Sequence, residues 1–355
     1  MDGNLKMKKI LTTLCAVAML AGCTAGGSKK SSTNTASTKE ETAATVMVGT
    51  GSVTNVSNKT KEGSDTAAQF DTTFASVVLE GNVIKYVYFD VAQDKVTYDA
   101  TGHVTSDNTA STSKKALGDK YGMKDKSSIK KEWYEQVEAL EKWAVGKTVE
   151  EVLNMPTTQK DEKHTVSADK DLMTGCTIGV TAFQQALDKA AKNAVEVKDV
   201  ASVGSAILTQ VSGKDASAEK SGEAKASSTY GVVALDKDGK VVFTQTDVAQ
   251  NAVKFTTAGV VDGEAVAIAT KGEKKDEYGM KKVSSIGKEW FEQNQAYDDW
   301  TVGKTGKEIA DMKVTTNEGG KTVTADKDLM TGCTIGVDSL QKVTTTAIEA
   351  ATKLN

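Results

Sequence analysis

Hydrophobic and polar residues alternate along one stretch of the chain at 76–91 and along a second at 232–235 and 241–248. Alternation at every second position is typical of β-strands with one buried face, and Val, Ile, Tyr and Phe favour strands. Glycine-containing polar breaks at 80–82 and 236–239 are typical of hairpin turns. The pattern therefore predicts two antiparallel hairpins, far apart in the sequence.

A helical pattern follows each hairpin. Short apolar groups at 96–98 and 253–255 first predict one further strand in each half. In the first half, Ser127 and Ser128 are then interpreted as the cap of a helix that ends at Gly146. Its apolar residues recur at helical spacing: Ile129, Trp133, Val137, Leu140 and Trp143.

Two more helices are expected in each half. Capping-box sequences, in which Glu follows Thr by three residues, predict a short helix after Thr148 and another after Thr305. The apolar patterns at 180–194 and 337–350 predict a longer, final helix. Strands followed by helices, without strand–helix alternation, predict an α+β fold with an antiparallel sheet.

One ten-residue sequence, Asp-Leu-Met-Thr-Gly-Cys-Thr-Ile-Gly-Val, occurs unchanged at 171–180 and 328–337. The copies are 157 residues apart (328 − 171), and the same offset relates several upstream segments. These are Tyr-Gly-Met-Lys at 121–124 and 278–281, Lys-Glu-Trp at 131–133 and 288–290, and Val-Gly-Lys-Thr at 145–148 and 302–305. We therefore expect two tandem domains, at 67–198 and 229–355, each long enough for its own core. The intervening 199–228, rich in Lys, Ser, Ala and Gly, is interpreted as a linker.

The N-terminus has the three-part pattern of a secretory signal: basic residues, a short apolar run, and small residues before Cys23. Leu-Ala-Gly-Cys at 20–23 resembles a lipoprotein box, so we expect 1–22 to be a signal peptide and Cys23 to be acylated. The alternative is an ordinary cleaved signal, and both Met1 and Met7 are possible starts. Residues 23–66 have few large apolar side chains and are expected to form a flexible tether.

Composition argues against several classes of site. The formal net charge is −4 and the chain has no arginine, which disfavours nucleic-acid binding. His103 and His164 have no histidine at the equivalent positions of the other copy, so no metal site is expected. Beyond Cys23, Cys176 and Cys333 supply one thiol per copy, too few for a disulfide scaffold. A disulfide between them would require the two loops to face each other.

The repeated loop has the features of a modification site. Gly175 and Gly179 flank Thr177, and glycine permits a tight turn and the close approach of a bulky group. The start of the next helix offers free N–H groups and a positive dipole end, which favour a phosphate. A threonine hydroxyl in this setting suits a phosphoester. The alternative is a structural role for Thr177 and Thr334 as helix N-caps.

The loop resembles the Asp-x-x-Ser/Thr-Gly-Ala-Thr acceptor sequence of the FMN-binding domain family. Members include the FMN-carrying subunits of the sodium-pumping quinone reductase and of the Rnf complex. In this family an ApbE-type FAD:protein FMN transferase leaves FMN on the last Thr through a phosphodiester bond. The matching residues are Asp171, Thr174, Gly175 and Thr177 in the first copy and Asp328, Thr331, Gly332 and Thr334 in the second. Cys176 and Cys333 stand where the family usually has Ala, and the small thiol is expected to be tolerated.

The resemblance implies two covalent FMN groups, on Thr177 and Thr334, with the rest of each acceptor sequence around them. Tyr121 and Tyr278, in polar glycine-containing segments, are further candidates for contact with the flavin. Four tryptophans are interpreted instead as core residues of the helices: Trp133, Trp143, Trp290 and Trp300. Lys124 and Lys281 could balance flavin charge, although solvated surface positions are the simpler interpretation.

The implied function is electron transfer rather than stand-alone catalysis, although ferric or flavin reductase activity is compatible with it. The protein would be lipid-anchored on the extracellular face of a Gram-positive cell membrane. It would accept electrons from the quinone pool and NADH dehydrogenase components and pass them to ferric iron or other external acceptors. The first alternative is a lipid-anchored binding or adhesion module whose duplicated loop is structural. The second, a substrate-binding lipoprotein, is disfavoured because tandem small domains do not form a two-lobed cleft.

Overall fold

The structure, a computed structural model, describes residues 45–59, 65–107 and 110–354, which belong to one compact unit. The predicted signal peptide, Cys23 and most of the predicted tether lie outside the described residues. The fold is α+β with antiparallel sheets, as the sequence predicts. Within the described part of the chain, no helix is long and apolar enough to cross a membrane.

The first sheet has four antiparallel strands in the order β3-β2-β1-β7. They are β1 (Val46–Lys59), β2 (Thr66–Glu80), β3 (Val83–Tyr98) and β7 (Val195–Val197). The β2–β3 hairpin confirms the turn predicted at 80–82. Residues 96–98 are the end of β3, so the prediction of a separate strand there is wrong. Strand β1 begins at Val46, within the tether predicted at 23–66, so the predicted tether is too long.

The second sheet repeats this arrangement in the order β10-β9-β8-β13, with β4 (Ala110–Ser111) paired to β8. Its strands are β8 (Ser202–Lys214), β9 (Gly222–Leu235), β10 (Val241–Phe255) and β13 (Thr352–Lys353). The β9–β10 turn confirms the prediction at 236–239, whereas 253–255 is the end of β10. The linker predicted at 199–228 is wrong, because it contains β8 and the first half of β9. The second repeat therefore starts with β8, well before residue 229.

The missed strands are built from small residues. Along the first half of β9, Gly222, Ala224, Ala226 and Ser228 are buried, while the side chains between them are partly exposed. Their alternation is therefore that of a strand, although the composition resembles that of a linker. Small side chains suit these positions because another layer of the protein lies close to the sheet.

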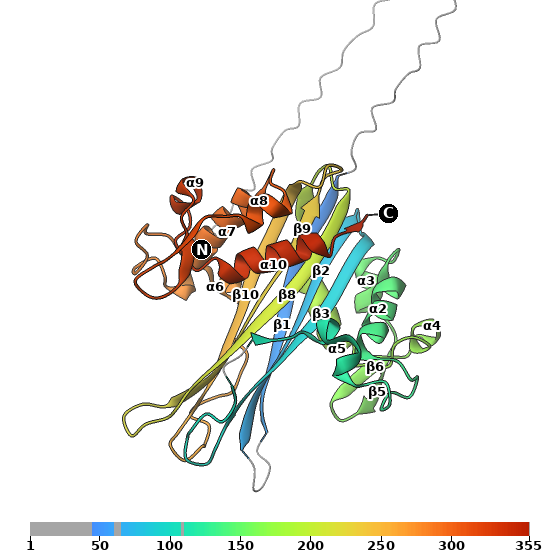
Figure 1. Ribbon diagram of the computed structural model, residues 1–355. Coiled ribbons are helices and arrows are strands. Elements are labelled where there is room, and N and C mark those ends of the chain that lie inside the picture. Colours follow the sequence, from blue (N-terminus) through green and yellow to red (C-terminus); the bar gives the residue numbers. More distant parts are fainter. Residues whose placement is uncertain (1–44, 60–64, 108–109, 355) are drawn as a thin grey trace, which may run out of the picture. The chain divides into compact units, whose positions relative to one another are not determined.

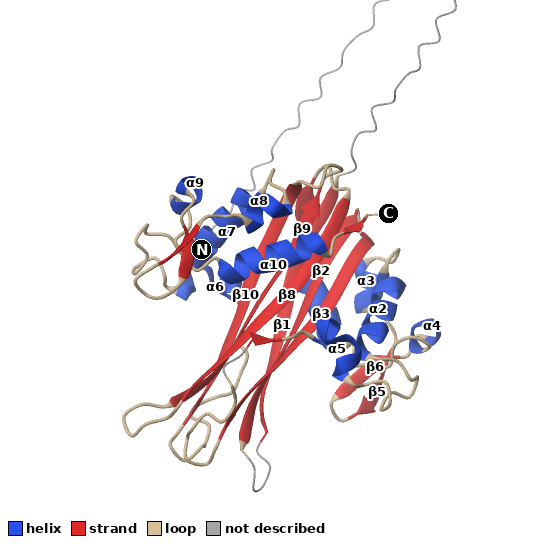
Figure 2. Cartoon of the chain, viewed as in Figure 1, coloured by secondary structure: helices blue, strands red, loops and turns tan. Residues whose placement is uncertain are grey.

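Each set of strands is followed by the same series of helices and a short hairpin. In the first repeat these are α1 (Lys114–Leu117), η1 (Gly118–Tyr121), α2 (Trp133–Ala144), α3 (Val149–Leu153), β5 (Thr157–Asp161), β6 (His164–Ser167), α4 (Lys170–Met173) and α5 (Thr181–Lys192). In the second they are α6 (Lys271–Lys274), η2 (Lys275–Tyr278), α7 (Trp290–Thr301), α8 (Gly306–Ala310), β11 (Val314–Thr316), β12 (Thr322–Thr324), α9 (Lys327–Met330) and α10 (Asp338–Glu349). Figure 2 shows each group of helices beside the strands of its own repeat.

The predicted capping boxes at Thr148 and Thr305 are confirmed, as are the final helices. The predicted start of the first long helix is wrong. Helix α2 begins at Trp133, and Glu132 with Glu135 forms its capping box, while Lys130 before it has a positive φ of 54°. Ser127 and Ser128 therefore lie in an irregular segment.

The final helices pack directly on strand glycines, and α10 lies across β8 and β9 in Figure 1. A Cβ atom on Gly49 of β1 would lie 2.4 Å from the carbonyl oxygen of Ala190 in α5. A Cβ on Gly204 of β8 would lie 1.8 Å from the carbonyl oxygen of Ala347 in α10. Only glycine allows this close approach of helix to sheet.

The two repeats contact each other through corresponding residues. The rings of Tyr98 and Phe255, 157 positions apart (255 − 98), stack at 3.8 Å. The rings of Phe74 and Tyr230 lie 5.0 Å apart. Ser76 of β2 and Ser205 of β8, which are not equivalent positions, also share a hydrogen bond of 2.5 Å. The two ring pairs bring equivalent positions of the repeats together, so the repeats form a direct interface in place of a linker-separated pair.

Candidate functional site

The acceptor loop begins in both repeats with a one-turn helix. In the first, Asp169 caps α4 by accepting from the backbone N–H groups of Asp171 and Leu172 at 3.0 and 2.9 Å. The Thr174 hydroxyl donates to the carbonyl of Asp171 at 2.8 Å, and Thr331 does the same with Asp328. Thr174 and Thr331 are therefore structural residues that end the helical turn.

The glycine of the loop is required by packing. A Cβ on Gly175 would lie 2.7 Å from the Ala139 Cβ of α2, and one on Gly332 would lie 2.8 Å from the Ala296 Cβ of α7. Neither glycine has a positive φ. The glycine therefore lets the loop lie against the preceding long helix.

Thr177 and Thr334 are held by a buried glutamine in each repeat. The Oε1 atom of Gln136 accepts from the Thr177 backbone N–H at 2.9 Å and from its hydroxyl at 3.2 Å. Gln293 does the same for Thr334, at 2.8 and 3.0 Å. Both glutamines are fully buried. Sequence reasoning missed them, although they are related by the same 157-residue offset (293 − 136).

The threonines are not helix caps. Helix α5 begins at Thr181, and its N-cap, Val180, makes no side-chain capping bond. Helix α10 likewise follows Val337 without a side-chain cap. The interpretation of Thr177 and Thr334 as helix N-caps is therefore wrong, and within the described part of the chain each hydroxyl donates to its glutamine.

Thr177 lines a cavity of about 770 Å³. Strands β1 to β3, the start of α5 and the β5–β6 hairpin line it. One part is apolar and includes Val53, Val91, Trp133, Ile178 and Phe183. A smaller hollow of about 380 Å³ shares Thr177 and Tyr121 with it.

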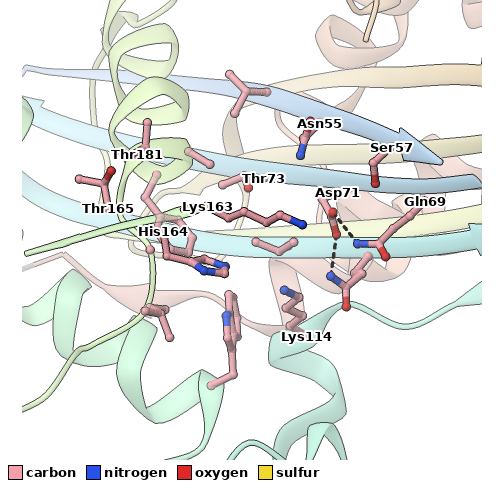
Figure 3. A pocket seen from close by; sticks show the side chains of 18 of the residues that line it. Asn55, Ser57, Gln69, Asp71, Thr73, Lys114, Lys163, His164, Thr165 and Thr181 are labelled. Atoms are coloured by element: carbon pink, nitrogen blue, oxygen red, sulfur yellow. Dashed lines mark hydrogen bonds between the residues drawn. The ribbon is translucent and has the colours of Figure 1, made fainter. Parts of the chain in front are cut away.

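The other part of the cavity is polar. The Asp71 carboxylate accepts from the side-chain amides of Gln69 and Gln93, both at 2.7 Å (Figure 3). Lys114 and Lys163 line the same space. In the second repeat Ser227 pairs with Gln250, at the register position where Asp71 pairs with Gln93. The two sites therefore differ in charge at this point.

A lysine lies over an aromatic pair in each repeat. Lys114 Nζ is 5.2 Å from the ring centroid of Tyr121 and 5.6 Å from that of Trp133. Lys271 Nζ is 5.6 Å from Tyr278 and 5.5 Å from Trp290. Tyr121 lines the cavity and Tyr278 is its equivalent in the second repeat, and contact of the two tyrosines with a flavin stays a prediction. The sequence analysis did not identify the two lysines. Trp133 has two roles, because it is buried and also lines the cavity.

Buried carboxylates position these lysines. Asp90 accepts from the Ser113 hydroxyl at 2.7 Å and from the Lys115 backbone N–H at 3.0 Å. These two residues flank Lys114, the first residue of α1, so the bonds fix the backbone on both sides of it. Asp247 plays the same part for α6, through the hydroxyl of Thr270 and the N–H of Gly272. Burial raises the pKa of both aspartates.

The second site brings other lysines close to Lys271. Burial, followed by repulsion from Lys321 and Lys225, lowers the pKa of Lys271 to about 8. In the first site, His164 stands at the position of Lys321 and bonds to Asp161. There the Lys160 ammonium donates to the Thr177 carbonyl at 3.1 Å. Both arrangements favour an anionic group.

The tyrosine segment is also fixed in place. The Glu132 carboxylate accepts from the backbone N–H groups of Met123 and Lys124, at 2.9 and 2.8 Å, and these bonds lower the pKa of Glu132. Glu289 binds Met280 and Lys281 in the same way. Lys124 does not line the cavity, in agreement with a surface role.

The cysteines are core residues. Cys176 and Cys333 are both free and buried, which excludes a disulfide between them in this structure. Burial raises the pKa of each thiol to about 11, far from the range of a reactive thiolate. Neither thiol is therefore suited to redox chemistry.

Comparison with known proteins adds no identification: no family model, no curated protein and no solved structure matches this chain. Among the residues that the structure describes, no three His, Cys, Asp or Glu side chains group as metal ligands would. The fold and site define a duplicated α+β protein. Each repeat contains a threonine whose hydroxyl donates to a buried glutamine, and in the first repeat this threonine lines a cavity of ligand size.

Proposed function

We propose that each repeat carries one FMN, joined through its phosphate to Thr177 or Thr334. The chain would be lipid-anchored at Cys23 on the outer face of the membrane and would relay electrons from the quinone pool to external acceptors such as ferric iron. The observation that carries this proposal is that Thr177 lines a cavity that has an apolar part and a polar part.

The residues of the cavity fit a flavin. Its volume, about 770 Å³, lies in the range of small-molecule sites. The apolar part, with Trp133 and Phe183, suits the dimethylbenzene end of the ring system. Asp71 and Gln93 supply an acceptor and an amide for the polar edge. Lys160 and the start of α5 lie on the side of Thr177, where they would favour the phosphate.

When bound, FMN would supply reversible uptake of one or two electrons. The chain holds the acceptor hydroxyl through Gln136, covers one face of the cavity with the Tyr121–Trp133 pair, and places the Lys114 ammonium beside that pair. A nearby cation stabilises the negative charge that accompanies reduction. Covalent attachment also fits an extracellular location, where a dissociable cofactor would be lost.

Substitution of the two threonines tests the proposal. In protein produced together with the flavin transferase, Thr177→Val and Thr334→Val are each expected to lose about half of the covalent flavin, and the double variant all of it. Valine keeps the shape of threonine but has no nucleophilic oxygen. In-gel flavin fluorescence after denaturation, with mass spectrometry of each acceptor peptide, measures the result.

Fluorescence that survives in the double variant would show that the flavin is attached elsewhere. A wild-type protein that takes up no flavin in the presence of active transferase would refute the carrier function and favour the adhesion module. Thr158→Val is the matched control, because this threonine is exposed on β5 and lies outside the acceptor sequence, so its substitution should leave the covalent flavin unchanged.

Asp71→Asn is expected to raise the reduction potential of the Thr177 flavin. A carboxylate in the cavity opposes the added electron, and the amide removes that charge while keeping the size of the side chain. The measurement is spectroelectrochemical titration in the Thr334→Val background, so that only one flavin is observed.

The same Asp71→Asn change in the Thr177→Val background is the control. The flavin on Thr334 belongs to a site with Ser227 in place of Asp71 and should keep its potential. An unchanged or lower potential at Thr177 would show that the polar end of the cavity does not face the flavin.

A further inference from the structure

The buried glutamines have an orientation that cannot be reversed. In the first repeat, Nε2 of Gln136 donates to the Lys131 carbonyl and to the Ser127 hydroxyl, both at 3.1 Å. On the other side of the amide, Oε1 accepts from the Thr177 backbone N–H. The Lys131 carbonyl can only accept a hydrogen bond, and the Thr177 N–H can only donate one. Rotation of the Gln136 amide by 180° would break its bonds to both groups, so Oε1 always faces the acceptor loop.

Gln293 repeats every one of these contacts. Its Nε2 donates to the Lys288 carbonyl at 3.0 Å and to the Ser284 hydroxyl at 3.1 Å, while its Oε1 faces Thr334. The surrounding side chains differ between the repeats, as the Ser227 and Asp71 positions show. The glutamine arrangement is thus kept where other parts of the two sites diverge.

The loop has a separate means of keeping its shape. The backbone N–H groups of Gly175 and Cys176 both donate to the Leu172 carbonyl, at 2.9 and 2.8 Å. The buried Leu172 anchors the turn from inside. The bond from the Thr177 hydroxyl to Gln136 is therefore an addition to a loop that is already closed.

A hydroxyl that gives its hydrogen to a fixed acceptor has both of its lone pairs free and its rotation restricted. Such restriction is what positions a nucleophile for attack. We propose that Gln136 and Gln293 are positioning residues for flavin attachment, which makes the folded repeat the substrate of the transferase. This inference rests on the proposed function and names the residues that prepare its acceptor.

The step balances as follows. The Thr177 Oγ forms a bond to the phosphorus of the FMN half of FAD, and the bond from that phosphorus to the bridging oxygen breaks. AMP leaves with the electron pair, and the hydroxyl proton goes to a base of the transferase, because an amide oxygen is too weak a base. After transfer, the Thr177 Oγ has no hydrogen to donate. Gln136 then keeps only its hydrogen bond from the Thr177 backbone N–H.

Each repeat is the internal control for the other. With purified apo-protein, transferase, FAD and Mg²⁺, Gln136→Met is expected to slow attachment at Thr177 by about tenfold or more, with the rate at Thr334 unchanged. Gln293→Met should give the mirror image. Peptide mass spectrometry over time separates the two rates, and the loss should lie in the maximal rate rather than in the KM for apo-protein.

Ser127→Ala is the matched control, because it removes one partner of Nε2 and leaves Oε1 in place. It should reduce the rate of attachment at Thr177 much less than Gln136→Met does. Equal rates at the two threonines in a folded Gln136→Met protein would overturn the proposal, as would equal slowing at both. Should Gln136→Met fail to fold, Gln136→Asn is the second variant, because it keeps the amide but withdraws it by one methylene. It must show the same selective loss of attachment rate at Thr177.

Failure of the proposed function gives a different result: neither threonine of the wild-type protein would accept FMN.

Discussion

Gly204→Ala is expected to lower the free energy of unfolding by about 3 kcal/mol. The added Cβ would lie 1.8 Å from the carbonyl oxygen of Ala347 and 2.9 Å from the Cα of Ala351. Both contacts are with backbone atoms of α10 and its C-terminal end, which cannot move aside as a flexible side chain would. The helix must therefore shift away from β8 and β9 and open the core that contains Val233 and Val343. Urea denaturation followed by circular dichroism measures the loss.

Gly319→Ala is the control, because Gly319 is exposed and the nearest atom to an added Cβ is the side-chain oxygen of Asn317 at 3.4 Å. It should change stability by less than about 0.5 kcal/mol. Gly49→Ala, which brings a Cβ to 2.4 Å from the Ala190 oxygen, should resemble Gly204→Ala and act on the first repeat. Wild-type stability of Gly204→Ala would mean that α10 does not pack this closely on its sheet.

The sequence predicted the elements whose signal is local. The β2–β3 and β9–β10 hairpins and the Thr148 and Thr305 capping boxes depend on neighbouring residues, and all are present. The strands β1 and β8 were assigned to a tether and a linker because Gly, Ser and Thr dominate them. Those small residues reflect a helix that approaches the sheet closely, which is a property of the tertiary structure and not of the local pattern.

The candidate site was predicted in part for the same reason. Duplication singled out Thr177 and Thr334, because an identical loop is visible in the sequence. Gln136 lies 41 residues before Thr177 and belongs to a different helix, so only the fold brings the two together. Lys114 was not predicted as a site residue either, although the second repeat also has a lysine, Lys271, at the equivalent position. A search for every polar residue identical between the repeats would have found both.

Asp298→Asn is expected to make the stability of the protein less sensitive to rising pH. Asp298 is 3% exposed, and its oxygens accept from the Thr246 N–H at 3.0 Å and from the Thr246 hydroxyl at 2.7 Å. Burial raises its pKa well above the usual value. In the unfolded chain an aspartate ionises near pH 4, at about 3.9. In the wild type, protonated Asp298 therefore contributes its full stabilisation below about pH 4. As pH rises from there towards the folded pKa, the free energy of unfolding falls by about 1.4 kcal/mol per pH unit.

Asparagine has no such proton, so the free energy of unfolding of Asp298→Asn relative to wild type should increase as pH rises from about 4 towards the folded pKa of Asp298. Urea denaturation across this range measures the difference. Asp125→Asn is the control, because Asp125 is exposed and belongs to the first repeat, and its difference from wild type should change much less over the same pH range. A flat difference for Asp298→Asn would mean that Asp298 is already ionised in the folded protein.

The first repeat shows why the second depends on pH in this way. Glu141, equivalent to Asp298, bonds to the Lys115 ammonium at 2.7 Å, yet burial still raises its pKa to about 7. Gly272 stands where Lys115 does, so the second repeat has lost the cation and retained the buried acid. The acid is accommodated there by Thr246 and Asn294, through hydrogen bonds that do not require a charge. The duplicated cores have thus reached different solutions to the same buried carboxyl, while the glutamine and threonine of the acceptor loop are the same in both.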